Sequence, residues 1–322
     1  MQSLSKTPVS IEIARQIAEK HLGATLVEFR ELTDGFFNTA CCLGLENGSR
    51  CVLKVAPPAE VNVLRYERNI LSSEVAVLKL VRAQTSMPVP EIICHDESRS
   101  LLPSPFFIMN FVEGVPLHKQ RESLTQNEQS EIDRQIGAYL REMNAIPGTE
   151  FGYFVQPDER RNTWPEAFAR IFANVLEDGQ MAGVELPYNE LACIPGQYTE
   201  ALAEVRSPRL VHWDLWDGNI FIDPVSHQIT GIIDFERALW ADPLMECNFG
   251  AFGINPNFIA GYGLELPYSP RQAIRRSLYN TYLYLIMVIE CTYRQYPGND
   301  QEKWAREQLQ RELKNLPTGL KA

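Results

Sequence analysis

The stretch LVHWDLWDGNI, residues 210–220, contains a histidine, an aspartate two positions later and an asparagine five positions after the aspartate. These residues are His212, Asp214 and Asn219. Fifteen residues beyond Asn219, the apolar run GII ends at Asp234. A spacing of H-x-D-x-x-x-x-N, followed by an apolar strand that ends in aspartate, is typical of the catalytic and metal-binding segments of kinases. The stretch therefore predicts phosphoryl-transfer chemistry, and the rest of the chain can be tested against it.

The residue types in this stretch suit that chemistry. Asp214 can accept the proton of an attacking hydroxyl and hold the hydroxyl in line. Asn219 and Asp234 offer an amide oxygen and a carboxylate, and Mg²⁺ prefers such hard oxygen ligands. We expect His212 to brace the loop by hydrogen bonding rather than to react. A hydrolase metal site built on His212 and Asp214 is a weaker interpretation, because the only other histidine nearby is His227, on an expected hairpin turn.

The sequence before residue 113 has the pattern of a β-rich unit. Asp-Gly at 34–35 and Glu-Asn-Gly at 46–48 are turn signals between runs of β-forming residues. An amphipathic helix over 7–21 precedes these runs, and a longer helical pattern over 61–83 ends before Pro88 and Pro90. The pattern predicts a five-stranded antiparallel sheet with one inserted long helix, the strands covering 25–32, 39–45, 49–55, 91–96 and 105–112.

The sequence after Gly114 is mainly helical. Two short β runs, 220–222 and 229–233, interrupt helical patterns at 124–144, 164–181, 188–204, 271–293 and 301–313. The sequence predicts an α+β protein with two lobes, an N-lobe over 1–112 that binds nucleotide and a C-lobe over 113–322 that carries the catalytic loop and the acceptor-binding helices. A cleft between two lobes is a natural ligand site.

A phosphate-anchoring lysine is expected in the N-lobe. Lys54 ends the third predicted strand in the run CVLKV, the position that such a lysine takes in kinases. Without the downstream motif this lysine would be interpreted as solvated. Its expected partner is a glutamate on the following helix; Glu74 is the first choice and Glu67 the alternative.

Two further segments are expected to contact the nucleotide. The first hairpin carries Gly35, which permits close backbone approach, and Asn38, which could donate to a phosphate. The segment 107–114 is expected to be the hinge, where the backbone near Asn110 and Val112 would meet the adenine. A plain turn and a core strand are the structural alternatives for these two segments.

The chain resembles the aminoglycoside phosphotransferase and choline kinase superfamily, whose members have a protein-kinase-like fold. The resemblance covers about 26–285 and is carried by VLKV at 52–55, MPVP at 87–90, the hinge at 107–114, the loop at 212–219, IIDFE at 232–236 and ADP at 241–243. The wording Asp-Leu-Trp-x-Gly-Asn is also similar to that of fructosamine kinases and related sugar kinases. The resemblance implies that Asp242 braces the C-lobe.

The chain departs from the pattern of that superfamily at three places. Residues 34–38 read DGFFN where Gly-Gly-x-Ser/Thr-Asn is usual, Trp213 stands where glycine is frequent, and Glu246 stands where aspartate is frequent. There is no A-P-E segment of the kind found in protein kinases, which disfavours a protein substrate.

The acceptor site is expected among the C-lobe helices, as in the relatives. Trp216, Glu236 and Trp240 lie near the catalytic loop in the sequence and could line the pocket, although core packing is an alternative for the tryptophans. Glu290 lies within an apolar helical pattern, where an ionised carboxylate is costly unless it is paired. Pairing with an arginine and a role in acceptor binding are both open for Glu290.

Composition limits the class of partner. The formal net charge of −11 argues against a nucleic-acid ligand and is compatible with a cationic acceptor. The seven cysteines are irregularly spaced, and the N-terminus lacks an apolar signal segment, as expected of a cytoplasmic protein with free thiols. The longest apolar run, near 283–289, is too short to span a membrane. No membrane partner is expected, and the sequence gives no indication of oligomeric state.

Together these patterns predict a phosphotransferase that depends on Mg²⁺ and ATP, with GTP not excluded. It would transfer the γ-phosphate to a hydroxyl of a small molecule such as an aminoglycoside-like antibiotic, an amino alcohol or a sugar derivative. The alternative is a nucleotide-binding pseudokinase or regulatory module, against which the complete set of site residues argues. The motifs do not distinguish among these acceptors.

Overall fold

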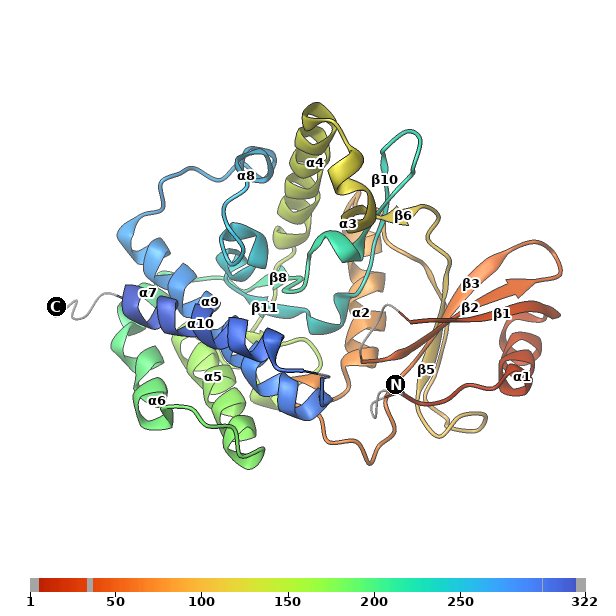
Figure 1. Cartoon of the computed structure of the whole chain (residues 1–322), viewed down its shortest axis with the longest axis horizontal. Coiled ribbons are helices and arrows are strands. Elements are labelled where there is room, and N and C mark those ends of the chain that lie inside the picture. Colours follow the sequence, from red (N-terminus) through yellow and green to blue (C-terminus); the bar gives the residue numbers. More distant parts are fainter. Residues whose placement is uncertain (1–5, 34–36, 297, 317–322) are drawn as a thin grey trace.

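The computed structural model describes residues 6–33, 37–296 and 298–316. The N-lobe is built on the predicted five-stranded antiparallel sheet, with strand order β1-β2-β3-β5-β4. Figure 1 shows this sheet at one end of the molecule and the helical C-lobe at the other. The strands are β1 Leu26–Leu32, β2 Thr39–Leu45, β3 Arg50–Val55, β4 Ile92–Asp96 and β5 Phe106–Asn110.

The sheet is covered on both faces by helices. Helix α1 (Ile11–Leu22) packs on one face, where Ile17 joins the buried cluster that contains Leu53, and α2 (Ile70–Gln84) packs on the other face with Val52. Neighbouring residues of β3 point to opposite faces, so both Val52 and Leu53 are buried. Gly23 ends α1 in the left-handed conformation, as its sequence position predicts.

The prediction for the start of the inserted helix is wrong. The helical pattern begins at residue 61, whereas α2 begins at Ile70 after a short 3-10 helix, Arg65–Glu67, and a left-handed Asn69. The backbone N–H of Arg65 donates to Asp178 of the C-lobe at 2.8 Å, and Glu67 forms an ion pair with Arg294. Contacts with the other lobe therefore override the local helical periodicity.

The C-lobe contains the predicted helices together with short elements that the sequence did not predict. The predicted helix over 188–204 is two helices, which are separated at Tyr198. The unpredicted elements are too short for a periodic signal. The helices are α3 Leu117–Gln120, α4 Gln126–Asn144, α5 Trp164–Met181, α6 Tyr188–Gln197, α7 Thr199–Leu202, α8 Pro256–Tyr262, α9 Pro270–Arg294 and α10 Asp300–Asn315, and the strands are β6 Val115–Pro116, β7 Gly152–Tyr153, β8 Arg209–Val211, β9 Ile220–Ile222, β10 Ile229–Ile232 and β11 Leu239–Ala241.

The segment between the lobes is fixed by close packing against the β9–β10 hairpin. Strand β6 pairs with β9, and Gly114 has φ +114°. A Cβ atom at Gly114 would lie 2.4 Å from the carbonyl oxygen of Ile222, so only glycine permits this approach. The hairpin that carries the metal-binding candidates is therefore held directly against the chain that joins the lobes.

Two expectations from composition can be compared with the structure. All seven cysteines are free thiols, as predicted. Among the described residues, no helix has the length and apolarity needed to cross a bilayer.

Candidate active site

The β9–β10 hairpin brings the predicted catalytic and metal-binding residues to one place. Asn219 immediately precedes β9, and its carbonyl accepts a hydrogen bond from the N–H of Ile233 at 3.0 Å. Asp234 follows at once, in the left-handed conformation with φ +71°. The side-chain amide of Asn219 donates to the carbonyl of Asp214 at 2.9 Å. The two predicted metal ligands thus lie at the same end of the hairpin, beside the predicted catalytic aspartate.

His212 supports this arrangement through both of its ring nitrogens. Its ring is buried; Nδ1 accepts the N–H of Asp214 at 3.2 Å, and Nε2 lies 3.2 Å from the carbonyl oxygen of Ile233. An imidazole that accepts at Nδ1 carries its proton on Nε2, which donates to that carbonyl. Burial lowers the pKa of His212 to about 4, so the ring is neutral near pH 7. Its contacts match the bracing position that the sequence predicts.

Glu246 supports the same loop from the other side, and the sequence gave it no site role. Its carboxylate accepts from the N–H of His212 at 2.7 Å and from the N–H of Trp213 at 2.9 Å. Burial raises its pKa to about 7. Trp213 is buried with φ +71°, a conformation that costs a bulky residue about 1–2 kcal/mol. The bidentate contact explains how a tryptophan is held where glycine is frequent in the relatives.

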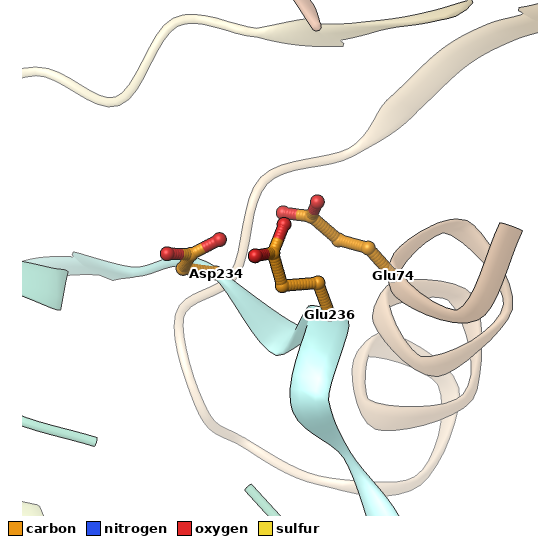
Figure 2. A group of neighbouring side chains, drawn as sticks. All are labelled: Glu74, Asp234 and Glu236. Atoms are coloured by element: carbon orange, nitrogen blue, oxygen red, sulfur yellow. The ribbon is translucent and has the colours of Figure 1, made fainter. Parts of the chain in front are cut away.

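Lys54 lies at the centre of three carboxylates. Its ammonium is 2.6 Å from Glu74 of α2, 2.7 Å from Asp234 and 3.2 Å from Glu236. Figure 2 shows that the three carboxylates converge from α2 and from the segment after β10. Of the two glutamates proposed as partner, Glu74 therefore makes the contact, whereas Glu67 pairs with Arg294.

One lysine does not balance three carboxylates. Burial acts to lower the pKa of Lys54, but the carboxylates outweigh it, so that the pKa is well above its usual range. Burial also acts to raise the pKa of Asp234, and attraction to Lys54 outweighs it and lowers that pKa. Burial raises the pKa of Glu74 and of Glu236. The surplus of hard oxygen donors fits a divalent cation such as Mg²⁺.

The three carboxylates also satisfy a distance test for a metal site. One oxygen from each of Glu74, Asp234 and Glu236 lies within 4.8 Å of the others. Glu236, which was predicted to line the acceptor pocket, lies beside Lys54. It contacts Lys54, and it accepts a hydrogen bond from the buried amide of Asn38 at 2.5 Å. The 3-10 helix Phe235–Arg237 turns this side chain toward the N-lobe.

The predicted nucleotide-contacting segments differ in what the structure shows of them. Gly35 lies outside the described residues. The N–H of Asn110 donates to the carbonyl of Glu91 at 3.0 Å, so it is already used within the sheet. Within the described part of the chain, the backbone of Val112 has no backbone hydrogen-bond partner. Val112 is therefore the better hinge candidate of the two.

Arg237 is a site residue that the sequence analysis missed. Its Nε lies 3.8 Å from Oδ2 of Asp214, and its Nη2 lies 3.3 Å from Oε2 of Glu290. Glu290 also lies 3.6 Å from Arg294. Of the two alternatives left open for Glu290, pairing with arginine is the one that the structure contains. The sequence feature that could have indicated it is an arginine three residues after Asp234, but this position alone did not show which carboxylate the arginine would contact.

The environment of Asp214 favours a proton acceptor that titrates near neutrality. Burial raises its pKa to about 7, Arg237 acts to lower it, and the carboxylates of Asp234 and Glu236 act to raise it further. The side chain is still 30% exposed, so a ligand can reach it. A carboxylate with a pKa near the working pH is suited to general-base catalysis.

The two tryptophans proposed for the acceptor site have different surroundings. Trp216 is 51% exposed and lies 5.4 Å, between ring centroids, from His118. Trp240 is buried in β11 and stacks on Phe154. Its ring also lies 2.7 Å from the position of a Cβ at Gly148. Of the two interpretations of Trp240, packing in the C-lobe core is the one that the structure contains, whereas Trp216 is exposed.

Comparison with known proteins agrees with this geometry. The model of the phosphotransferase enzyme family matches residues 28–263. A protein of Vibrio cholerae serotype O1 named "Probable ketoamine kinase" is 26% identical over 229 residues, which are 66% of this chain and 71% of that protein. A counterpart from Vibrio parahaemolyticus is 25% identical over 65% of this chain and 70% of its own length.

Solved structures share the fold at lower identity. The crystal structure of a candidate fructosamine-3-kinase from Thermobifida fusca has a TM-score of 0.70 and 17% identity, covering 95% of this chain and 100% of that chain. The GDP complex of aminoglycoside 2'-phosphotransferase-IIIa has a TM-score of 0.65 and 17% identity, covering 96% and 99%. Because the family model matches well over half of the residues, the chain belongs to the phosphotransferase enzyme family, with a protein-kinase-like fold and small-molecule kinase relatives.

Proposed function

We propose that this protein transfers the γ-phosphate of ATP to a hydroxyl of a small molecule, with Mg²⁺ as cofactor. The observation that supports this most strongly is the contact of one lysine with three carboxylates, on the same hairpin end that carries Asp214 and Asn219. Such a site has a cation for phosphate and an excess of oxygen donors for metal. Phosphoryl transfer by such a site needs no covalent nucleophile from the protein.

The metal-binding residues in this proposal are Asn219 and Asp234, with Glu236 as an additional candidate from its position. These residues would hold Mg²⁺, which would neutralise the charge that develops on the phosphate oxygens. Glu74 orients Lys54 by the 2.6 Å ion pair, so that the ammonium points toward the α- and β-phosphates. Asn38 fixes the carboxylate of Glu236 from the N-lobe side.

The residues around Asp214 position the acceptor hydroxyl and take its proton. Asp214 is the base, and His212 holds its backbone N–H. Glu246 holds the two preceding N–H groups, so the loop has little freedom to shift. Arg237 orients the Asp214 carboxylate and limits the rise in its pKa. Catalysis by such a site is mainly positioning and charge stabilisation.

The donor nucleotide is expected to bind along the hinge. The unpaired backbone of Val112 would contact the adenine, with Asn110 at the edge of the sheet behind it. A structural relative binds GDP, as its description states, so both ATP and GTP belong in the test.

The acceptor class is inferred from the relatives. Sequence relatives include proteins named as probable ketoamine kinases, and structural neighbours include aminoglycoside phosphotransferases. Ketoamines and aminoglycosides both carry sugar hydroxyls and amines, and the net charge of −11 is compatible with a cationic acceptor. The exposed Trp216, two residues after Asp214, is the candidate wall of the acceptor pocket.

The test is acceptor-dependent ADP release over a panel of ketoamines, aminoglycosides, choline, homoserine and macrolides. At least one acceptor should raise ADP release, and Asp214→Asn should lower kcat by about 10²–10⁴-fold while nucleotide still binds. Asp158→Asn, which removes an exposed carboxylate, is the matched control and should leave the rate unchanged. Nucleotide binding without any acceptor response would favour the pseudokinase alternative. Full turnover in Asp214→Asn would contradict the assignment of the base.

A further inference from the structure

Two exposed aromatic side chains of the C-lobe stack on each other. Among the residues that the structure describes, three phenylalanine or tryptophan side chains are exposed: Trp216, Phe252 at 63% and Trp304 at 38%. Phe252 and Trp304 stack on each other, with ring centroids 6.1 Å apart and an angle of 14° between the planes. Large aromatic groups that remain exposed to water commonly mark a binding surface.

Phe252 and Trp304, the aromatic pair, come from segments far apart in the sequence that a buried tyrosine holds together. Phe252 lies in the segment before α8, between two glycines with positive φ, and Trp304 lies on α10. The ring of Tyr284 contacts Trp304 edge-on at 5.8 Å, and its hydroxyl donates to the carbonyl of Ala251 at 2.5 Å. Tyr284 therefore supports the aromatic pair, which is not formed by two independent surface side chains.

The segment that carries Phe252 is connected to the catalytic loop. Cys247, five residues earlier, donates through its thiol to the carbonyl of Trp213 at 3.2 Å. The neighbouring Glu246 holds the N–H of the same tryptophan. Trp213 immediately precedes Asp214, so the segment begins next to the proposed general base and ends at the exposed ring of Phe252.

The helix that carries Trp304 is connected to Asp214 by a second route. Gln301, one helical turn before Trp304, donates to Glu290 at 3.4 Å. Glu290 contacts Arg237, which contacts Asp214. Figure 1 shows that α10 begins on the side of the C-lobe that faces the N-lobe. Both partners of the aromatic pair thus lie on segments that are linked to the catalytic aspartate through intervening residues, Trp213 for one and Glu290 with Arg237 for the other.

We propose that the aromatic pair binds an apolar, ring-bearing substituent of the acceptor, whose hydroxyl lies at Asp214. This inference rests on the proposed function and adds a specificity determinant to it. Phe252 and Trp304 together offer a single polar atom, the indole nitrogen, and Ile254 beside them is 49% exposed. A hydroxylated ring would need polar partners at this surface, whereas an aromatic or hydrocarbon substituent would not.

The experiment uses two ketoamines made from fructose that differ only in the amine substituent, benzyl or methyl. Calorimetry with the full chain, Mg²⁺ and a non-hydrolysable ATP analogue gives the two dissociation constants. Wild type should bind the benzyl compound about three- to tenfold more tightly, as ring stacking of this kind provides. In the double variant Phe252→Ala, Trp304→Ala the two constants should become equal.

Controls separate this inference from the proposed function. Val225→Ala, which trims an exposed side chain on the β9–β10 hairpin, should keep the benzyl preference. If the double variant does not fold, Phe252→Ser alone should still reduce the preference. Equal affinities in wild type, a preference that survives the double substitution, or no binding of either ketoamine would overturn the inference. ADP release with the same two compounds separately reports whether either is an acceptor.

Discussion

Two charged clusters make up the site, and they differ in how charge is balanced. In the lysine cluster, the carboxylates of Glu74, Asp234 and Glu236 share one cation, Lys54. In the arginine chain, charges alternate: Asp214, Arg237, Glu290, Arg294 and Glu67 follow one another, each paired with the next. The first cluster has more carboxylates than cations, whereas the second nearly balances itself.

This difference indicates different roles. Buried carboxylates without enough cations are costly, so they persist where an additional cation binds. A chain of alternating charges needs no ligand and holds its members in place. We therefore assign metal and phosphate binding to the lysine cluster, and the positioning of Asp214 to the arginine chain.

Within this comparison, the largest expected effect comes from removing Lys54, the cation of the lysine cluster. Lys54→Met should lower kcat/KM for the nucleotide by about 10²–10³-fold, because an electrostatic donor to the phosphates is lost. Lys79→Met, on the exposed side of α2, is the matched control and should have little effect. Steady-state kinetics on both variants tests this prediction. If kcat/KM falls equally in both, Lys54 has no specific role in binding the phosphates.

The two buried glutamates give a direct contrast between the clusters. Glu74→Gln should lower kcat/KM by about tenfold, because Lys54 loses its charged partner. Glu67→Gln should instead lower the free energy of unfolding by about 1–3 kcal/mol, because Arg294 is left buried with a weaker partner. Kinetics and chemical denaturation of both variants separate the effects; an interchange of the two results would reverse the assignment of the clusters.

The pH dependence of the reaction tests the arginine chain. The pKa of Asp214 is raised to about 7, and the base must be ionised, so kcat/KM should fall as the pH drops below about 7. Arg237→Gln removes a cation that lowers this pKa, so the acid limb should move to higher pH, by about one unit for charges at this separation. Arg237→Lys should return the acid limb to nearly the pH at which it lies in the wild type. If the acid limb of Arg237→Gln lies at the same pH as that of the wild type, Arg237 does not lower the pKa of Asp214.

The smallest expected effect is at the two tryptophans. Trp216→Leu should raise the KM of the acceptor by about two- to tenfold, with the nucleotide affinity unchanged, because the loss is one exposed ring contact. Trp240→Leu should leave that KM unchanged and lower thermal stability, because its ring is packed on Phe154. Melting curves and acceptor kinetics compare the pair, and a raised KM in Trp240→Leu would return that residue to the acceptor site.

The lysine cluster was largely predictable from the sequence. Strand and loop motifs place these residues by local patterns, because Lys54 lies near the end of β3, Asn219 immediately precedes β9 and Asp234 follows β10. The partner of Lys54 could be narrowed to two candidates, Glu74 and Glu67, because side chains on one face of a helix recur every three to four residues. What the sequence did not show is that Glu236 turns toward Lys54, because the 3-10 helix that aims it has no periodic signal.

The arginine chain was not predictable in the same way. Its links join residues far apart in the sequence, such as Arg237 with Glu290 and Glu67 with Arg294. Such pairs depend on how α9 crosses the segment before α2, and the same contacts shortened the predicted inserted helix. Short strands such as β8 and β11, and the division between α6 and α7, were missed because tertiary packing determines them.

The most direct test of the lysine cluster as a Mg²⁺·nucleotide site is a calorimetric titration of ATP into the full chain with Mg²⁺ and with EDTA. Binding should be at least about tenfold tighter with Mg²⁺, because the metal neutralises carboxylates that otherwise repel the phosphates. Asp234→Asn should remove most of that advantage. Equal affinity for ATP with Mg²⁺ and with EDTA in the wild type would contradict the account.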